Sequence, residues 1–337
     1  MKEFLRFFLK TITTKRLLNA LLVYMGFYFS RFFKSAKPWG MPISLSIEPT
    51  TACNLGCPEC PSGLKQFSRD TGNLKADNFN RWLDQLSPTL SYLNFYFQGE
   101  PFIHNDILDF ISKASQKGIY TSTSTNAHFI TEKRAQEIVR SGLDRILISI
   151  DGTTQDVYEQ YRVHGTLQKV LDGTKNLIEA RKNLNSSTPH IIFQFLVVRP
   201  NEHQIEEAKQ LANDYKVDEI RFKTAQVYDY ENGNPLIPTI EKYSRYKRLS
   251  NGKFIVKSSL DNHCWRMWSG AVVTWDGKVV PCCFDKDATH EMGNLSKEDF
   301  KSIWKGKAYT QFRKQLLKGR KEIDICKNCS EGTKVWA

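Results

Sequence analysis

The stretch EPTTACNLGCPECPSG, residues 48–63, decides how the chain is interpreted because it places three cysteines close together. Cys53, Cys57 and Cys60 follow the spacing C-x3-C-x2-C, which is one thiolate short of a closed four-ligand metal site. An iron–sulfur cluster on three cysteines keeps one iron free for an exogenous group, whereas zinc on three protein ligands keeps a position for water. The spacing favours the cluster, and zinc remains the alternative.

The composition predicts a cytoplasmic globular protein. The 337 residues, 40% of them hydrophobic, are enough for one large domain and a smaller one. The eight cysteines fall in two groups, near residue 55 and between residues 264 and 329, which is typical of metal ligands in a reducing cytoplasm and not of a secreted disulfide framework. Residues 1–37 supply +7 of the net charge of +12, so a general nucleic-acid-binding surface is not indicated.

The basic N-terminal segment contains an apolar run, LLNALLVYMGFYFS, at residues 17–30. Its fourteen residues are fewer than the roughly 20 that a membrane-spanning helix needs. Two interpretations of residues 1–41 therefore remain. One is a helical pair packed on the domain, and the other is an amphipathic anchor whose basic flanks in residues 1–37 contact the inner membrane surface.

From residue 42 onward, short β-rich runs alternate with segments of helical period. The predicted strands are residues 42–48, 93–98, 119–125, 145–150, 190–198 and 219–224, and the predicted helices are residues 76–86, 106–118, 131–142, 167–183 and 204–216. This alternation predicts an α/β fold with a parallel sheet built from βαβ units. In such folds ligands bind at the carboxyl ends of the strands, which is where the three cysteines follow the first strand.

Three cysteines after the first strand of a six-fold β/α repeat resemble the radical S-adenosylmethionine (radical SAM) superfamily, whose fold is a partial (β/α)6 TIM-like barrel. The resemblance implies a 4Fe-4S cluster on Cys53, Cys57 and Cys60, with the amino and carboxylate groups of S-adenosylmethionine chelating the free iron. It places the barrel at residues 42–235. One departure is Glu59, where the family often has an aromatic residue near the adenine.

The turns after the later strands resemble the cofactor-binding turns of the same family. FQGEP resembles its glycine-rich segment, with Gln98 where a first glycine is usual, and STSTNA resembles its S/T-x-N turn, with Ala127 in place of a common glycine. ISIDG follows strand four, and an arginine in YEQYRVHG is suited to hold the cofactor carboxylate in a bidentate fork. The residues that the resemblance implies for cofactor binding are Gly99, Glu100, Ser124, Asn126, Ser149, Asp151 and Arg162.

The C-terminal cysteines resemble a SPASM domain in its shortened, twitch form, with a small cysteine-rich β-hairpin and helix in residues 236–337. AVVTWDGKVVPCC reads as a hairpin because Asp276-Gly277 separates two β-rich runs. The resemblance implies a second, auxiliary 4Fe-4S cluster held by Cys264, Cys282, Cys326 and Cys329. Cys283 is then the spare cysteine, expected near the cluster or buried. A zinc ribbon is the alternative for this set.

The resemblance implies an oxidoreductase that cleaves S-adenosylmethionine to a 5′-deoxyadenosyl radical, receives electrons from a flavodoxin or ferredoxin, and oxidises an unactivated C–H bond. The expected substrate is a small molecule, a glycan or a lipid-linked compound, with Gln194 and Lys223 facing it and the auxiliary cluster accepting an electron. One alternative is a maturase of a ribosomally made peptide. Another is a non-catalytic zinc or electron-carrier protein. A membrane anchor would bring the barrel mouth close to the lipid surface.

Overall fold

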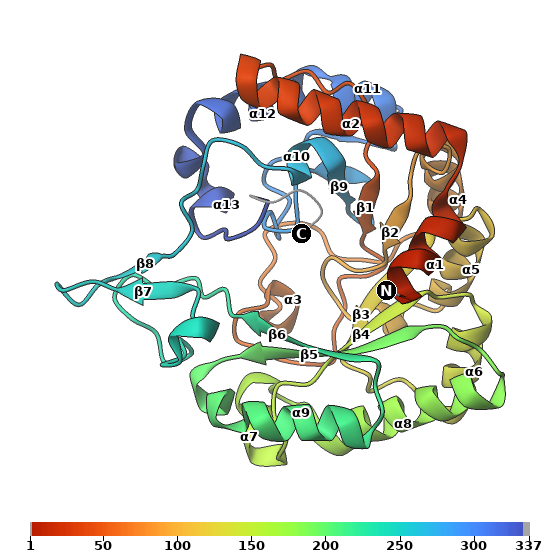
Figure 1. Ribbon diagram of the computed structural model, residues 1–337, viewed down its shortest axis with the longest axis vertical. Coiled ribbons are helices and arrows are strands. Elements are labelled where there is room, and N and C mark those ends of the chain that lie inside the picture. The colour runs from red at the N-terminus through yellow and green to blue at the C-terminus, as the bar shows by residue number, and fades with distance from the viewer. Residues whose placement is uncertain (1, 333–337) are drawn as a thin grey trace.

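A nine-stranded sheet curves around a central space and is covered on its outside by helices (Figure 1). This computed structural model describes residues 2–332. The strands run in the order β11-β10-β9-β1-β2-β3-β4-β5-β6, and the six from β1 to β6 pair in parallel. They are β1 (Ser44–Ile47), β2 (Tyr92–Asn94), β3 (Tyr120–Thr125), β4 (Arg145–Ser149), β5 (His190–Val197) and β6 (Glu219–Thr224). The predicted α/β fold with a partial barrel is confirmed.

The second strand is shorter than the sequence predicts. β2 ends at Asn94. The N–H of Phe95 still donates to the Ser122 carbonyl of β3 at 2.7 Å, and residues 96–98 leave the ladder. The Asn94 side-chain amide donates to the carbonyl of Tyr96, which bends the chain at this point. Phe97 is buried in a core cluster, so its apolar character reflects burial and not strand pairing.

The helices of the barrel lie where the helical period predicts them. Each predicted helix is found within two residues of its expected ends, as α4 (Ala76–Leu86), α5 (Ile107–Gln116), α6 (Glu132–Arg140), α8 (Leu167–Asn183) and α9 (Ile205–Asp214). Their apolar faces cover the outside of the sheet; α4, for example, buries Phe79, Trp82 and Leu83. Further elements complete the fold: α3 (Pro61–Leu64), α7 (Gln155–Tyr161), α10 (Arg266–Ser269), α11 (Phe300–Lys305), α12 (Lys307–Gly319), α13 (Asp324–Lys327), β7 (Tyr246–Arg248) and β8 (Phe254–Val256).

The predicted C-terminal hairpin is present, and it joins the main sheet. β9 (Gly270–Val273) and β10 (Lys278–Val280) pair antiparallel, with Gly277 in the turn at φ 91°, and β11 (Gly293–Asn294) follows at the edge. β9 also pairs in parallel with β1 over four residues, which the sequence did not indicate. The boundaries of the three predicted regions stay a prediction, but one sheet runs through the last two.

The N-terminal segment forms two helices, α1 (Lys2–Thr11) and α2 (Thr14–Phe33). The inner face of α2 buries Val23 and Phe27, and the Phe27 ring packs edge-on against Trp265 at 5.2 Å between centroids. Arg16 is buried as well. Its guanidinium donates to the carbonyls of Ser87, Lys117 and Gly118 and so fastens the start of α2 to the loops that lead into β2 and β3.

α1 lies at the amino ends of β3 and β4. The Glu3 carboxylate accepts hydrogen bonds from the Tyr120 hydroxyl at 2.7 Å and from Arg145 Nε at 2.6 Å. The cysteines 53–60 lie at the carboxyl end of β1, so the two helices are at the opposite end of the barrel from this loop. The expectation that an anchor would bring the barrel mouth close to a membrane is therefore wrong. Among residues 2–332, no helix is both long and apolar enough to cross a bilayer.

Candidate active site

The loop after β1 brings its three cysteines to one cavity. Cys53, Cys57 and Cys60 all line a hollow of about 220 Å³ at the carboxyl ends of the strands, and all three are free thiols. The loop is fixed from the outside, because Gly56 N–H donates to the carbonyl of Val163 at 2.8 Å. Gly63 lies against the Cys57 backbone, where an added Cβ would come within 2.6 Å of the amide nitrogen.

The electrostatics of this cavity fit a metal cluster. Burial raises the pKa of Cys53 to about 12, and burial also raises the pKa of Cys57, although Arg162 Nη1 lies 3.7 Å from its sulfur and favours the thiolate. Thiolates at these positions therefore need a strong positive charge to form at neutral pH, and metal coordination supplies it. Three converging thiols with no disulfide among them are a donor set suited to a 4Fe-4S cluster with one open iron.

Most of the residues expected to bind S-adenosylmethionine line the same cavity. They are Gly99, Glu100, Ser124, Asn126, Ser149 and Arg162. Asp151 is placed differently, because it is fully buried behind the wall of the cavity. Its carboxylate accepts from Arg162 Nε and, at 2.7 Å, from the backbone N–H of Leu196. Asp151 therefore orients the Arg162 guanidinium, and Arg162 presents its outer edge to the cavity.

The turn after β2 is built around Gly99 and Glu100. Gly99 has φ 75°, and a Cβ there would lie 2.2 Å from the carbonyl oxygen of Thr50, so the backbone of this turn touches the loop that carries the cysteines. The Glu100 carboxylate accepts from the N–H of Asn126 and from the Thr125 hydroxyl, both at 2.8 Å. Burial raises the Glu100 pKa to about 7. Glu100 thus ties the turns after β2 and β3 together.

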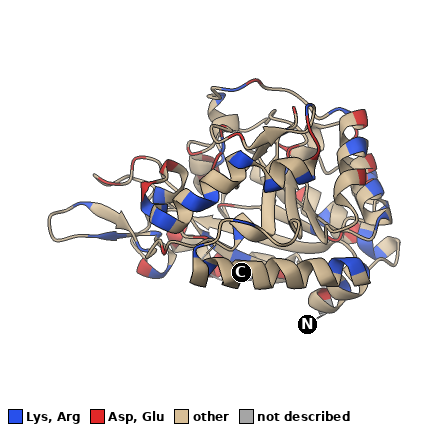
Figure 2. Ribbon diagram, turned by 90° about the horizontal axis from the view of Figure 1, so that it is seen from above, with Lys and Arg blue, Asp and Glu red and all other residues tan. Residues whose placement is uncertain are grey.

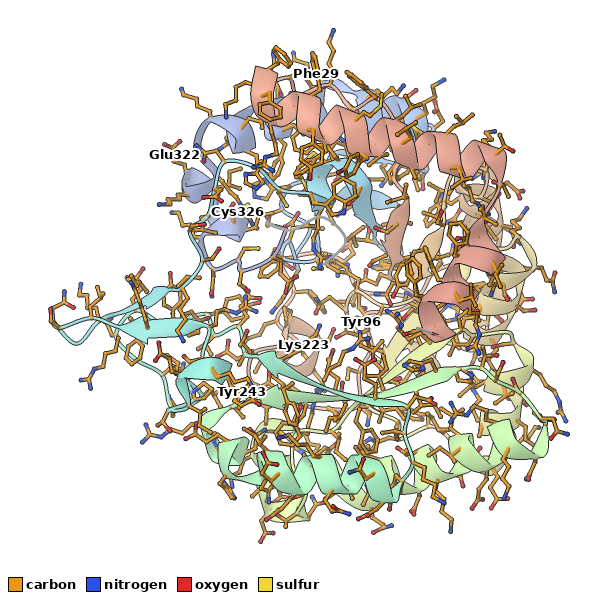
Figure 3. All side chains as sticks on the ribbon, in the orientation of Figure 1. Phe29, Tyr96, Lys223, Tyr243, Glu322 and Cys326 are labelled. Atoms are coloured by element: carbon orange, nitrogen blue, oxygen red, sulfur yellow. The ribbon has the colours of Figure 1, made fainter. Side chains whose placement is uncertain are left out.

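A second cavity of about 590 Å³ fills the interior of the barrel and continues from the first. Tyr96, Ser124 and Gln194 line both, and Lys223 lines the second, as expected from its strand. Figure 3 shows Tyr96 and Lys223 facing the space that the strands enclose. Three arginines in this wall are paired with acids, as Arg145 with Glu3, Arg221 with Glu219 and Arg266 with Glu331. Lys223 makes no ion pair within residues 2–332.

The second group of cysteines converges at another hollow, which adjoins the barrel cavity. Cys264, Cys282, Cys326 and Cys329 line one small apolar hollow, and burial raises the pKa of each thiol. The buried guanidinium of Arg320 donates to the Cys329 sulfur at 3.4 Å, which offsets negative charge there. This set fits a fully ligated 4Fe-4S cluster.

Cys283 lies outside this set, as expected, but it is not buried. It is exposed and lines the barrel cavity, and it is not among the residues that line the small hollow. Cys282 lines both spaces. The candidate auxiliary cluster therefore borders the barrel cavity, which also borders the three-cysteine site.

Comparison with known families agrees with this geometry. The model described as "Radical SAM superfamily" matches residues 47–212, and the one described as "Iron-sulfur cluster-binding domain", SPASM, matches residues 264–330. The chain belongs to the radical SAM superfamily. It accordingly uses S-adenosylmethionine and a 4Fe-4S cluster, and its SPASM domain adds auxiliary iron–sulfur binding.

Curated relatives of this radical SAM protein modify other molecules. It is 27% identical over 305 residues to the tungsten-containing aldehyde ferredoxin oxidoreductase cofactor-modifying protein of Pyrococcus furiosus, with 80% of this chain and 82% of the relative covered. It is 24% identical over 288 residues to the PqqA peptide cyclase of Bradyrhizobium diazoefficiens, with 80% and 72% covered.

Solved structures share the fold of this radical SAM protein. Streptococcus suis SuiB bound to S-adenosylmethionine aligns with a TM-score of 0.63 at 16% identity, over 87% of this chain and 73% of that one. BtrN in complex with AdoMet and 2-DOIA aligns with a TM-score of 0.53 at 18% identity, over 86% and 94%. At these identities the likeness concerns the fold.

Proposed function

We propose that this radical SAM enzyme modifies an unactivated C–H bond of a substrate held in the barrel cavity, between the two cluster sites. The observation that carries the proposal is the continuity of the three spaces. Tyr96, Ser124 and Gln194 join the barrel cavity to the S-adenosylmethionine side, and Cys282 joins it to the auxiliary side. When bound, the cofactors supply a 5′-deoxyadenosyl radical on one side and an electron acceptor on the other.

The chain's own residues bind and orient the reactants. Arg162, held by Asp151, is placed for the carboxylate of S-adenosylmethionine, and the turns joined by Glu100 fix the residues that surround it. Gln194 lies where the first two cavities meet and is suited to orient the C–H bond that reacts. The unpaired Lys223 ammonium is suited to bind an anionic group of the substrate.

A peptide is the substrate class that the relatives favour, because the PqqA peptide cyclase covers 80% of this chain. This supports the maturase alternative better than the small-molecule, glycan or lipid-linked substrate expected from the sequence. The second candidate is nevertheless a lipid-linked substrate. It is favoured by an apolar cavity that shares Ser44, Tyr92 and Arg266 with the barrel cavity.

The test is deuterium transfer into 5′-deoxyadenosine from labelled peptides and labelled lipid-linked or free polyols, using anaerobically reconstituted enzyme. Lys223→Met should raise KM for the true substrate at least tenfold while S-adenosylmethionine still binds. Replacing Cys53, Cys57 and Cys60 together by Ala should remove one of two clusters and abolish cleavage of S-adenosylmethionine. Cleavage that persists in the triple variant would refute the assignment of the cluster site.

A further inference from the structure

The outer face of α1 and α2 is unusually apolar. Of the 21 exposed large apolar side chains in the described part of the chain, 15 lie within residues 4–39. On α2 they form one stripe at helical spacing, comprising Leu18, Leu22, Met25, Phe29 and Phe32. Phe32 is 79% exposed and Phe4 on α1 is 73% exposed. Apolar patches of this extent on a monomer mark a binding surface.

The exposed charged groups of residues 3–37 that flank this stripe are basic, and this segment has no exposed acidic group. Lys15 at the start of α2 and Arg31, Lys34 and Lys37 at its end are all exposed. Glu3 is the one acidic residue in the sequence of residues 1–37, and its carboxylate is turned into the barrel toward Tyr120 and Arg145. Figure 2 shows α2 along one edge of the molecule, uncoloured over most of its length. The face therefore combines an apolar stripe with a positive border.

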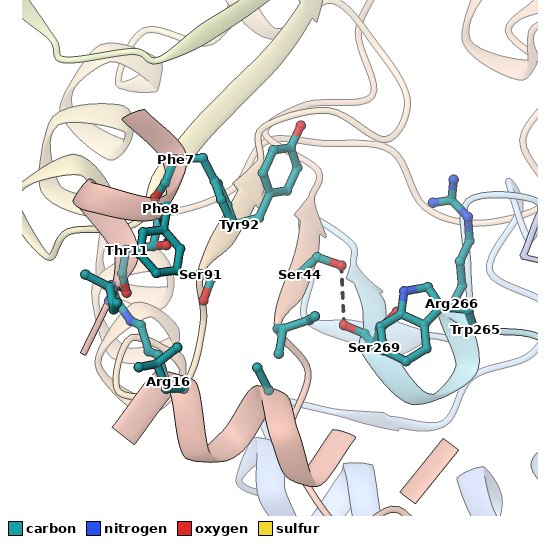
Figure 4. A pocket seen from close by; sticks show the side chains of 14 residues that line it. Phe7, Phe8, Thr11, Arg16, Ser44, Ser91, Tyr92, Trp265, Arg266 and Ser269 are labelled. Atoms are coloured by element: carbon teal, nitrogen blue, oxygen red, sulfur yellow. Dashed lines mark hydrogen bonds between the residues drawn. The ribbon is translucent and has the colours of Figure 1, made fainter. Parts of the chain in front are cut away.

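Beneath the helices lies an apolar cavity of about 350 Å³, enclosed by α1, α2 and the amino ends of β1 and β2 (Figure 4). Phe8, Ile12 and Leu17 line the cavity and also belong to the exposed face, so the two are contiguous. Ile43 and Trp265 form its buried inner wall.

We propose that α1 and α2 dock on the surface of an anionic lipid bilayer and that the cavity beneath them holds an acyl chain of a lipid drawn from it. An amphipathic helix with a basic border binds anionic lipid through both its apolar area and its charge. A second copy of this chain fits the face less well, because two such faces would bring the basic groups of residues 3–37 together, and that segment has no exposed acid to pair them. The docking holds for either substrate class.

Docking is tested by sedimenting the full, cluster-loaded chain with vesicles of phosphatidylcholine, with or without phosphatidylglycerol. Each basic group near the surface contributes about fivefold, so Arg31→Gln/Lys34→Gln should weaken binding to the anionic vesicles about 25-fold. The matched control, Lys247→Gln/Arg248→Gln, removes two exposed charges from β7 and should bind as the native chain does. Equal binding by all three proteins, or none by the native chain at low salt, overturns the docking.

The contribution of the apolar stripe is tested with a second double variant and its matched control. Leu18→Gln/Leu22→Gln should lose vesicle binding at least tenfold, whereas Leu249→Gln/Ile255→Gln, at two other exposed apolar positions, should not. Light scattering of the native chain without lipid tests the alternative occupant of this face, a second copy of the chain. A dimer that Leu18→Gln/Leu22→Gln converts to monomers, together with no vesicle binding, would show that the face pairs with a second copy and would refute the proposal.

The cavity is tested with a phosphatidylglycerol that carries a photoreactive group in its acyl chain. Adducts are expected on Ile43 and Trp265, which are 6% and 5% exposed and cannot meet the bilayer directly. Ala20→Leu narrows the cavity and should abolish these adducts while vesicle binding remains. Adducts confined to outer residues such as Leu18 and Phe32 refute the acyl-chain site. Thermal unfolding of Ala20→Leu checks that this variant folds. If it does not fold, the positions of the adducts on the native chain still decide whether the cavity holds an acyl chain.

Discussion

Replacing Gly99 by Ala should detach the turn after β2 from the loop that carries the cluster ligands. At φ 75° an alanine is strained by about 1–2 kcal/mol. In addition its Cβ would lie 2.2 Å from the Thr50 carbonyl oxygen and 2.9 Å from that of Ala52, so one backbone segment has to move by about 1 Å. Overpacking of this kind costs about 1–3 kcal/mol, which gives a total loss of about 2–5 kcal/mol.

Gly252→Ala is the matched control, because Gly252 also has a left-handed backbone, φ 83°, but its added Cβ would meet nothing closer than 3.9 Å. It should lose only the strain of about 1–2 kcal/mol and keep both clusters. The assay is denaturant unfolding of the apoprotein, together with iron and sulfide counts after anaerobic reconstitution. Gly99→Ala should lose about half of the iron. If both variants lose the same stability and Gly99→Ala keeps its iron, the contact with Thr50 is not what positions the cysteines.

Three further predictions follow from the geometry. Cys282→Ala should lower the iron content whereas Cys283→Ala should not, and equal losses would show that the wrong cysteine of the pair was chosen. Arg320→Lys should make the auxiliary cluster easier to lose on chelation, measured against Lys321→Arg, because the guanidinium that reaches Cys329 also holds the carbonyl of Glu331. For Glu3, burial raises the pKa, but hydrogen bonds from Arg145 and Tyr120 outweigh it and bring it below the usual 4.5. The native chain should therefore exceed Glu3→Gln in stability above pH 4.5, and the difference should vanish as the pH falls through the lowered pKa; a constant difference from pH 3 to 7 would contradict the ion pair.

Local sequence patterns predicted most of the helices and strands of the fold. The helical period placed α4 and α8 at their observed bounds, and the β-rich runs placed five of the six parallel strands, because burial on one face imposes these patterns on short segments. The exception is residues 96–98, where Phe97 is buried without strand pairing. A β-propensity does not distinguish an aromatic residue buried in the core from one in a paired strand.

The parts of the candidate site that depend on short cysteine spacings were predictable from the sequence. The parts in which distant segments of the chain meet were not. The cysteine spacings grouped Cys53 with Cys60 and Cys326 with Cys329, since only a few residues separate them. Nothing local indicates that Tyr96 joins two cavities, or that Glu3 contacts Arg145 across 142 positions. The same limit explains Asp151, whose place behind the cavity wall depends on Arg162 and on the backbone of β5.

The parallel pairing of β1 with β9 constrains how the chain can fold as it is synthesised. Ser44 pairs with Gly270, so one edge of β1 has no partner until more than two hundred further residues have left the ribosome. Contacts of such long sequence separation form slowly, and an unpaired strand edge is a place where chains associate wrongly. The auxiliary-cluster region thus also supplies β9, the strand that pairs with the free edge of β1. Chains truncated before residue 270 should accumulate as aggregates even though the three cysteines and all the residues expected to bind S-adenosylmethionine, which lie between positions 53 and 162, are present in them.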